Sequence, residues 1–133
     1  MTLADSNIFM YAAGREHAFK GRSASFLERV AVGSLDAAVD AAVLQEILHR
    51  YRALGRWAEG KAVYDAARIV FPIVLSVTAE VMDGARLLLD QYPGLMARDA
   101  VHASVVRVYN LESICSFDRD FDKIRGLRRI EPK

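Results

Sequence analysis

Short apolar segments of strand type alternate with amphipathic helical segments along this chain, and this alternation is the strongest constraint on its fold. Residues 2–4, 73–77 and 113–116 are apolar runs typical of buried strands. Weaker strand candidates lie at residues 36–40 and 128–130. Strands that alternate with helices predict an α/β layered domain with a mostly parallel central sheet.

The segments between the strands carry apolar residues at helical spacing. In residues 42–54, Val43, Ile47 and Tyr51 fall within one apolar arc, and Glu46 lies beside its edge. We therefore expect Glu46 to be half-buried. Helices are also expected at residues 8–13, 23–32, 57–70, 78–90 and 96–109.

Length and composition fit one globular domain over residues 1–133. Hydrophobic residues make up 53% of the chain and charged residues 26%, which excludes a disordered tail. Eighteen Lys and Arg residues against 17 Asp and Glu residues give a net charge of +1. This balance excludes a cationic protein that coats nucleic acid, so any contact with nucleic acid must be local.

No segment indicates a membrane span or a signal peptide. The longest stretch without a charge, residues 69–79, contains Pro72 and is too short to cross a bilayer. Asp5 stands where a signal peptide would carry positive charge. The lone Cys115 cannot form an internal disulfide, so we expect a reduced, cytoplasmic protein.

Four acidic residues are expected to meet at one edge of the sheet. Asp5 follows the first strand and Asp118 lies just past the strand at residues 113–116. Glu46 and Asp99 lie in the N-terminal halves of helices expected to begin at the same edge. Asp99 sits in a helix that is apolar on nearly every side, so its carboxylate needs a partner.

Four neighbouring carboxylates predict a divalent cation, because gathering like charges in a partly apolar pocket is costly. An all-oxygen set of ligands favours Mg²⁺ or Mn²⁺. A pair of such ions activates a water molecule and stabilises both oxygens of an in-line phosphodiester displacement. The pattern therefore favours metal-dependent hydrolysis of nucleic acid.

The acids stand in four short motifs that resemble those of the PIN-domain nucleases, in particular the single-domain VapC-type toxins of toxin–antitoxin pairs. In order and approximate spacing all four match, over nearly the whole chain. The motifs are Asp5-Ser6-Asn7-Ile8-Phe9, Leu44-Gln45-Glu46-Ile47, Arg98-Asp99-Ala100-Val101-His102-Ala103 and Ser116-Phe117-Asp118-Arg119-Asp120-Phe121.

The resemblance implies a Mg²⁺- or Mn²⁺-dependent endoribonuclease with a three-layer α/β/α fold and a short, mostly parallel sheet of four to five strands. It also implies a homodimer that a cognate antitoxin protein holds inactive. The residues that match the family's four acids, as catalytic groups and metal ligands, are Asp5, Glu46, Asp99 and Asp118. Residues that orient these acids or replace the fourth are Asn7, Ser116, Asp120 and Asp122.

Contacts to RNA are expected near the C-terminus. Residues 119–133 carry six cations against three acids, and Arg119, Lys123 and Arg125 are the candidates for binding phosphates. A solvated basic surface explains the same excess equally well. Three aromatic residues could stack on bases, Tyr11, Tyr51 and Trp57, although aromatic residues at helical spacing belong more often to a core or an interface.

Other classes of protein share parts of this pattern. Glu46 with His49 and Asp99 with His102 have the spacing of di-iron carboxylate bundles, which need long helices and no sheet. A receiver-like signalling domain also gathers acids and Mg²⁺ at strand ends, but its central strand is followed by an Asp, which is absent after residues 73–77. A non-catalytic interaction domain with a structural metal stays open.

Overall fold

The protein is built on one sheet of five parallel strands, which the computed structural model describes together with the rest of residues 1–133. The strands follow the order β3-β2-β1-β4-β5, and neighbouring strands are parallel. The strands are β1 (Thr2–Ala4), β2 (Ala37–Asp40), β3 (Val74–Leu75), β4 (Ser113–Cys115) and β5 (Arg129–Ile130). Because all strands run in the same direction, their carboxyl ends form a single edge.

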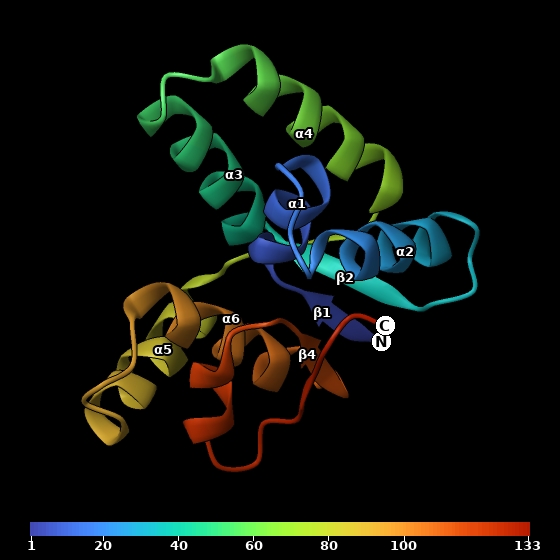
Figure 1. The fold of residues 1–133 in the computed structure, drawn as a ribbon. Coiled ribbons are helices and arrows are strands. Elements are labelled where there is room, and N and C mark those ends of the chain that lie inside the picture. The colour runs from blue at the N-terminus through green and yellow to red at the C-terminus, as the bar shows by residue number, and fades with distance from the viewer.

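Helices cover both faces of the sheet (Figure 1). The helices are α1 (Ser6–Ala13), α2 (Lys20–Ala31), α3 (Ala41–Ala53), α4 (Trp57–Val70), α5 (Ala79–Gln91), α6 (Ala97–Val108) and the 3₁₀ helix η1 (Arg119–Lys123). Helices α1 to α4 lie on one side, and α5 and α6 pair on the other. This arrangement confirms the predicted three-layer α/β/α fold.

Alternating strand residues divide the core between the two faces. In β1, Ala4 packs into the cluster formed with α1 to α4, whereas Leu3 packs against α5 and α6. In β4, Cys115 and Ile114 divide in the same way. Each of these four side chains is fully buried. The short strands β1 and β4 therefore contribute to the core on both faces of the sheet.

Most predicted elements are confirmed, and the largest differences lie at a sheet edge and a polar helix start. The buried strand predicted at residues 73–77 is reduced to Val74–Leu75, which are only half-buried because β3 is an edge strand beside β2 alone. Helix α2 begins at Lys20 instead of Ser23. Its first turn is polar, so the apolar periodicity gave no signal there.

The topology excludes two of the alternative folds. A di-iron bundle has no sheet, so that hypothesis is wrong for this chain. A receiver-like sheet has the strand order 2-1-3-4-5, whereas this sheet has the order 3-2-1-4-5. None of the helices is both long enough and apolar enough to span a membrane.

Three of the strand-to-helix junctions are capped by acidic side chains, which therefore lie at the carboxyl edge of the sheet. Asp5 follows β1 and accepts a hydrogen bond from the Ser6 amide at 2.7 Å. Asp40 ends β2 and accepts from the Val43 amide at 2.8 Å. Asp118 follows β4 and caps η1. Each cap satisfies a free amide of a helix start and fixes where its carboxylate lies.

Helices α3 and α4 approach closely where Gly60 faces Tyr51. A Cβ atom at Gly60 would lie 2.5 Å from the Tyr51 Cβ atom, which the backbone holds in place. We therefore expect Gly60→Ala to lower the free energy of unfolding by about 1 to 3 kcal/mol. Gly21→Ala on α2, where no atom lies within 4 Å, should raise it by up to about 1 kcal/mol. Urea unfolding measures both, and equal effects would contradict the close approach.

Candidate active site

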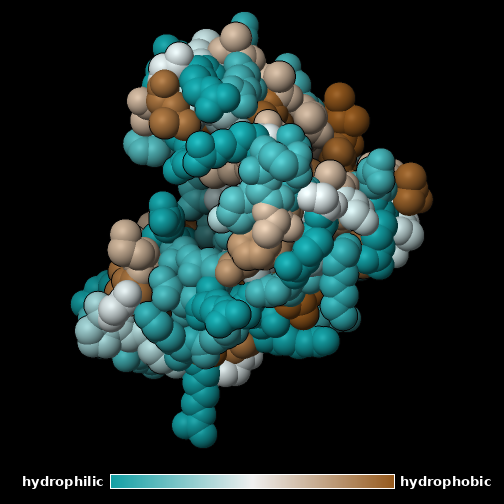
Figure 2. All heavy atoms as spheres, in the orientation of Figure 1, coloured by the Kyte–Doolittle hydropathy of each residue, from teal (hydrophilic) through white to brown (hydrophobic).

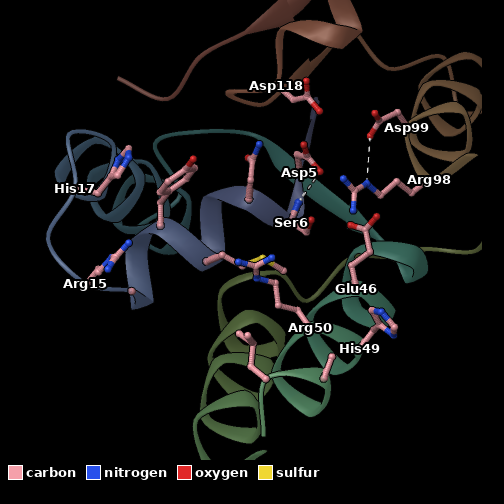
Figure 3. Close-up of a pocket in the computed structure, with 16 residues that line it drawn as sticks. Asp5, Ser6, Arg15, His17, Glu46, His49, Arg50, Arg98, Asp99 and Asp118 are labelled. Carbon is pink, nitrogen blue, oxygen red and sulfur yellow. Dashed lines mark hydrogen bonds and ion pairs between the residues drawn. The ribbon is translucent and has the colours of Figure 1, made fainter. Parts of the chain in front are cut away.

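A cavity of about 650 Å³ opens at the carboxyl edge of the sheet. In Figure 2 the surface is hollowed between the helices of the two layers, and hydrophilic residues surround the hollow. All four acids of the predicted cluster line this cavity: Asp5, Glu46, Asp99 and Asp118. They come from four different elements and point toward one another (Figure 3).

Asp5 is the most tightly held of these acids. Its Oδ2 atom accepts a hydrogen bond of 2.6 Å from the Ser116 hydroxyl, and that hydroxyl in turn accepts from the Asn7 side-chain amide at 3.1 Å. Burial raises the pKa of Asp5 above its ordinary value, although His102 and the Ser116 hydroxyl oppose this. Ser116 thus contacts Asp5 directly, and Asn7 supports Ser116 from the other side.

The three acids after β4 have different surroundings. Asp118 lines the cavity, and its Oδ1 atom accepts a hydrogen bond of 2.9 Å from the Asp120 amide. Asp120 lies close enough to Asp99 and Asp118 to share an ion with them, and it also pairs with Lys123 at 3.0 Å. Asp122 is exposed and forms two hydrogen bonds with Arg129, which hold its pKa below the ordinary value. Of the three, Asp118 alone lines the cavity.

Glu46 projects from α3 and is half-buried, as its position beside the apolar arc predicts. Its two carboxylate oxygens each lie 3.2 Å from Nε2 of His102, on α6. Burial by itself raises the pKa of Glu46, but the hydrogen bond and charge of His102 outweigh it and leave that pKa below its ordinary value. Glu46 is therefore a stable carboxylate.

Asp99 has the least satisfied carboxylate of the cluster. It is buried, its Oδ2 atom has no hydrogen-bond partner, and its Oδ1 atom lies 4.0 Å from Nε of Arg98. Burial, followed by the charges of Asp118 and Asp5, raises the pKa of Asp99 to about 6. No protein donor therefore satisfies the buried Oδ2 atom of Asp99.

These groups fit a divalent cation. Two sets of three groups could each hold an ion, because the ligand atoms within a set lie within 4.8 Å of one another: Asp5 with Glu46 and His102, and Asp99 with Asp118 and Asp120. The buried Oδ2 atom of Asp99 lacks a partner, and a cation would satisfy it. Carboxylate oxygens supply most of both sets, which suits Mg²⁺ or Mn²⁺.

Basic residues form another part of the cavity lining, here called the basic wall, and the sequence did not predict it. Arg15 and His17 come from the segment between α1 and α2, and Arg50 and His49 come from α3 (Figure 3). His49 lies one turn after Glu46 on the same helix, and in the sequence this spacing indicates only the di-iron alternative. The segment between α1 and α2 carried no comparable signal.

The basic residues expected near the C-terminus lie elsewhere. Arg119, Lys123 and Arg125 are exposed and do not line the cavity. Tyr11 does line it, packed edge-on against Phe19 and Phe117.

His102 and Asp40 are also site residues that the sequence did not reveal. Of the two histidines at the di-iron spacing, His49 is exposed at the cavity and His102 is completely buried. His102 contacts Asp40, which lies 62 residues away in the sequence. No local pattern connects residues so far apart.

Comparisons with known proteins show the family to which this chain belongs. The model of the PIN domain family matches residues 2–127. The ribonuclease VapC13 of Mycobacterium tuberculosis is 38% identical over 130 residues, which cover 98% of this chain and 99% of the relative.

Two solved structures share the fold. VapBC2 from Rickettsia felis, bound to a DNA fragment from its promoter, has a TM-score of 0.76 at 17% identity and covers 98% of this chain and 97% of its own. VapC20 of Mycobacterium tuberculosis, a toxin that cleaves the Sarcin-Ricin loop, has a TM-score of 0.71 at 21% identity and covers 96% of each chain.

Asp99 should oppose folding when no metal is bound. Its pKa is about 6 in the folded protein against 3.8 in a model peptide, so stability falls as the pH rises from about 4 to 6 and stays reduced above. Asp99→Asn should raise the metal-free free energy of unfolding at pH 7.5 by about 2 kcal/mol, and this gain should shrink as the pH falls toward 4.

Urea unfolding in EDTA at several pH values measures this effect. Asp65→Asn, on the exposed face of α4, is the matched control and should leave stability nearly unchanged at every pH. A lower free energy of unfolding in Asp99→Asn at pH 7.5 would contradict the claim that the ionised Asp99 carboxylate opposes folding.

Proposed function

Because this chain belongs to the PIN-domain family, we propose that it is a metal-dependent endoribonuclease, the toxin of a VapBC-type toxin–antitoxin pair. The observation that carries the proposal is the meeting of acids from four elements in one cavity, with the buried Oδ2 atom of Asp99 lacking a partner. The 38% identity to a curated VapC ribonuclease over nearly the full length supports the same activity.

Asp5, Glu46, Asp99 and Asp118 are the residues that would hold Mg²⁺ or Mn²⁺. The bound ion supplies activation of water and neutralises charge on the phosphate oxygens. Ser116 fixes one oxygen of Asp5, and the Ser6 amide fixes the other, so this carboxylate keeps its orientation without an ion. Hydrolysis of the P–O3′ bond would leave a 3′-hydroxyl and a 5′-phosphate.

The basic wall of the cavity would bind the RNA backbone. Arg15 and Arg50 line the same cavity as the acids (Figure 3), so their charges would attract the phosphates that flank the scissile bond. They are better placed for this role than Arg119, Lys123 and Arg125, which lie outside the cavity. RNA is therefore the proposed substrate, with backbone contacts at the mouth of the cavity.

The remaining partners are a cognate antitoxin protein and a second copy of this chain. Large apolar side chains stand exposed on α4 and at the ends of α2 and α3, including Ile69 at 82%, Val32 at 79% and Leu54 at 52%. Exposed apolar surface on a small domain is typical of an interface. We propose that residues 1–133 act as one cytoplasmic domain whose interfaces involve these helices.

Removal of one acid should abolish cleavage without unfolding the protein. The purified protein, free of bound partner, is incubated with total cellular RNA in Mg²⁺, in Mn²⁺ and in EDTA, and the new 5′ ends are sequenced. We expect discrete cuts that need the metal and fall at least about 10²-fold in Asp5→Asn and in Asp99→Asn. Asp65→Asn is again the control. Cleavage by Asp99→Asn at the wild-type rate in Mn²⁺ would contradict the role of that residue.

The basic wall can be tested separately from the chemistry. Arg15→Gln and Arg50→Gln should raise the KM for RNA by roughly tenfold with little change in kcat, because each removes a phosphate contact and no metal ligand. Lys123→Gln and Arg125→Gln are matched losses of charge outside the cavity. If these two raise KM and the cavity variants do not, the RNA follows the C-terminal surface instead.

A further inference from the structure

His102 is a buried polar residue that the proposed chemistry leaves without a role. It lies on α6, one turn after Asp99, and its side chain is completely shielded from solvent. Its two ring nitrogens face two carboxylates, those of Asp40 at the end of β2 and of Glu46 on α3. A buried histidine with both nitrogens so engaged is fixed in orientation.

Asp40 holds the first nitrogen. Its Oδ2 atom lies 2.7 Å from Nδ1 of His102, and its Oδ1 atom caps the Val43 amide at 2.8 Å. Both oxygens of this fully buried carboxylate are thus occupied. Because an ionised carboxylate only accepts hydrogen bonds, Nδ1 must donate. Asp40 therefore sets the position and the angle of the ring.

The second nitrogen meets Glu46. Nε2 lies 3.2 Å from each of its carboxylate oxygens and 3.9 Å from Oδ1 of Asp5. Since Glu46 is also an acceptor, Nε2 donates a second hydrogen bond. Asp40 and Glu46 lie at the start and in the first half of the same helix, α3, so His102 joins α6 to α3 beside the acid cluster.

We infer that His102, oriented by Asp40, is a positioning residue for Glu46: it holds this carboxylate at the cavity and thereby strengthens the binding of a divalent cation. The inference rests on the proposed metal-dependent function, and it adds a residue that sets the affinity of the site for the cation. A carboxylate offers about four lone-pair positions, so a hydrogen bond from Nε2 leaves others for the ion. Outer partners of this kind commonly change metal affinity by about 10- to 100-fold.

Two amide variants separate the two ends of the ring. In His102→Asn the side-chain amide replaces Nδ1 and keeps the bond to Asp40, but it is too short to reach Glu46. In His102→Gln the longer side chain brings a donor to the position of Nε2. The control is Ser104→Ala on the same helix, because Ser104 is equally buried but donates to the Val81 carbonyl on α5.

The affinity for Mn²⁺, measured without RNA from the electron paramagnetic resonance signal of the free ion, is the readout. We expect His102→Asn to weaken binding about tenfold and His102→Gln to stay within about threefold of the wild type. Ser104→Ala should bind as the wild type does. Thermal unfolding is recorded for each variant so that binding is compared only among folded proteins.

A double-mutant cycle tests whether His102 acts through Glu46. In a Glu46→Gln background, His102→Asn should add less than about a twofold further loss. A merely structural role would weaken binding equally in both backgrounds and would overturn the inference. So would wild-type affinity in His102→Asn, or nitrogen coupling that shows His102 bound directly to Mn²⁺.

The failure of the proposed function has a different signature. If the wild-type protein takes up no Mn²⁺, the metal-dependent activity fails and the role of His102 fails with it. If the wild type binds Mn²⁺ and His102→Asn binds it equally well, the role of His102 alone fails.

Discussion

The gathering of like charges at one buried edge of the sheet is the constraint on which the rest of the site depends. Burial raises the pKa values of Asp5 and Asp99, and for Asp99 the neighbouring carboxylates raise it further, to about 6. Such a site is stable only if positive charge offsets the repulsion. The hydrogen bond from His102 keeps Glu46 ionised by lowering its pKa. The buried, unpartnered oxygen of Asp99 is the place where a cation is still needed.

The fold imposes this proximity through its topology. Parallel strands bring all their carboxyl ends to one edge, and an aspartate lies at or just after the end of β1, β2 and β4. Asp5, Asp40 and Asp118 each accept a hydrogen bond from a nearby backbone amide. The hydrogen bonds that cap the helix starts therefore also fix the positions of the carboxylates. The same residues contribute to the stability of the fold and to the geometry of the site.

The parts of the site that depend on local patterns could be predicted from the sequence. Asp5 and Asp118 follow apolar strand segments, and Glu46 lies beside an apolar helical arc, so their placement at one edge follows from the period of each element. The contact between Asp40 and His102 could not be predicted, because it joins residues 62 positions apart across two layers. The basic wall could not be predicted for a similar reason, because Arg15 belongs to a connecting segment whose path depends on the packing of α1 against α2.

The most direct test of the central claim is to locate the cation. Crystals of the wild-type protein grown with Mn²⁺ and measured at the manganese absorption edge would show the ion by its anomalous signal. We expect the strongest peak in contact with the carboxylate oxygens of Asp5, Glu46, Asp99 or Asp118, with the unpartnered oxygen of Asp99 among its ligands. A peak elsewhere on the protein, with these carboxylates bound to protein groups alone, would contradict the account.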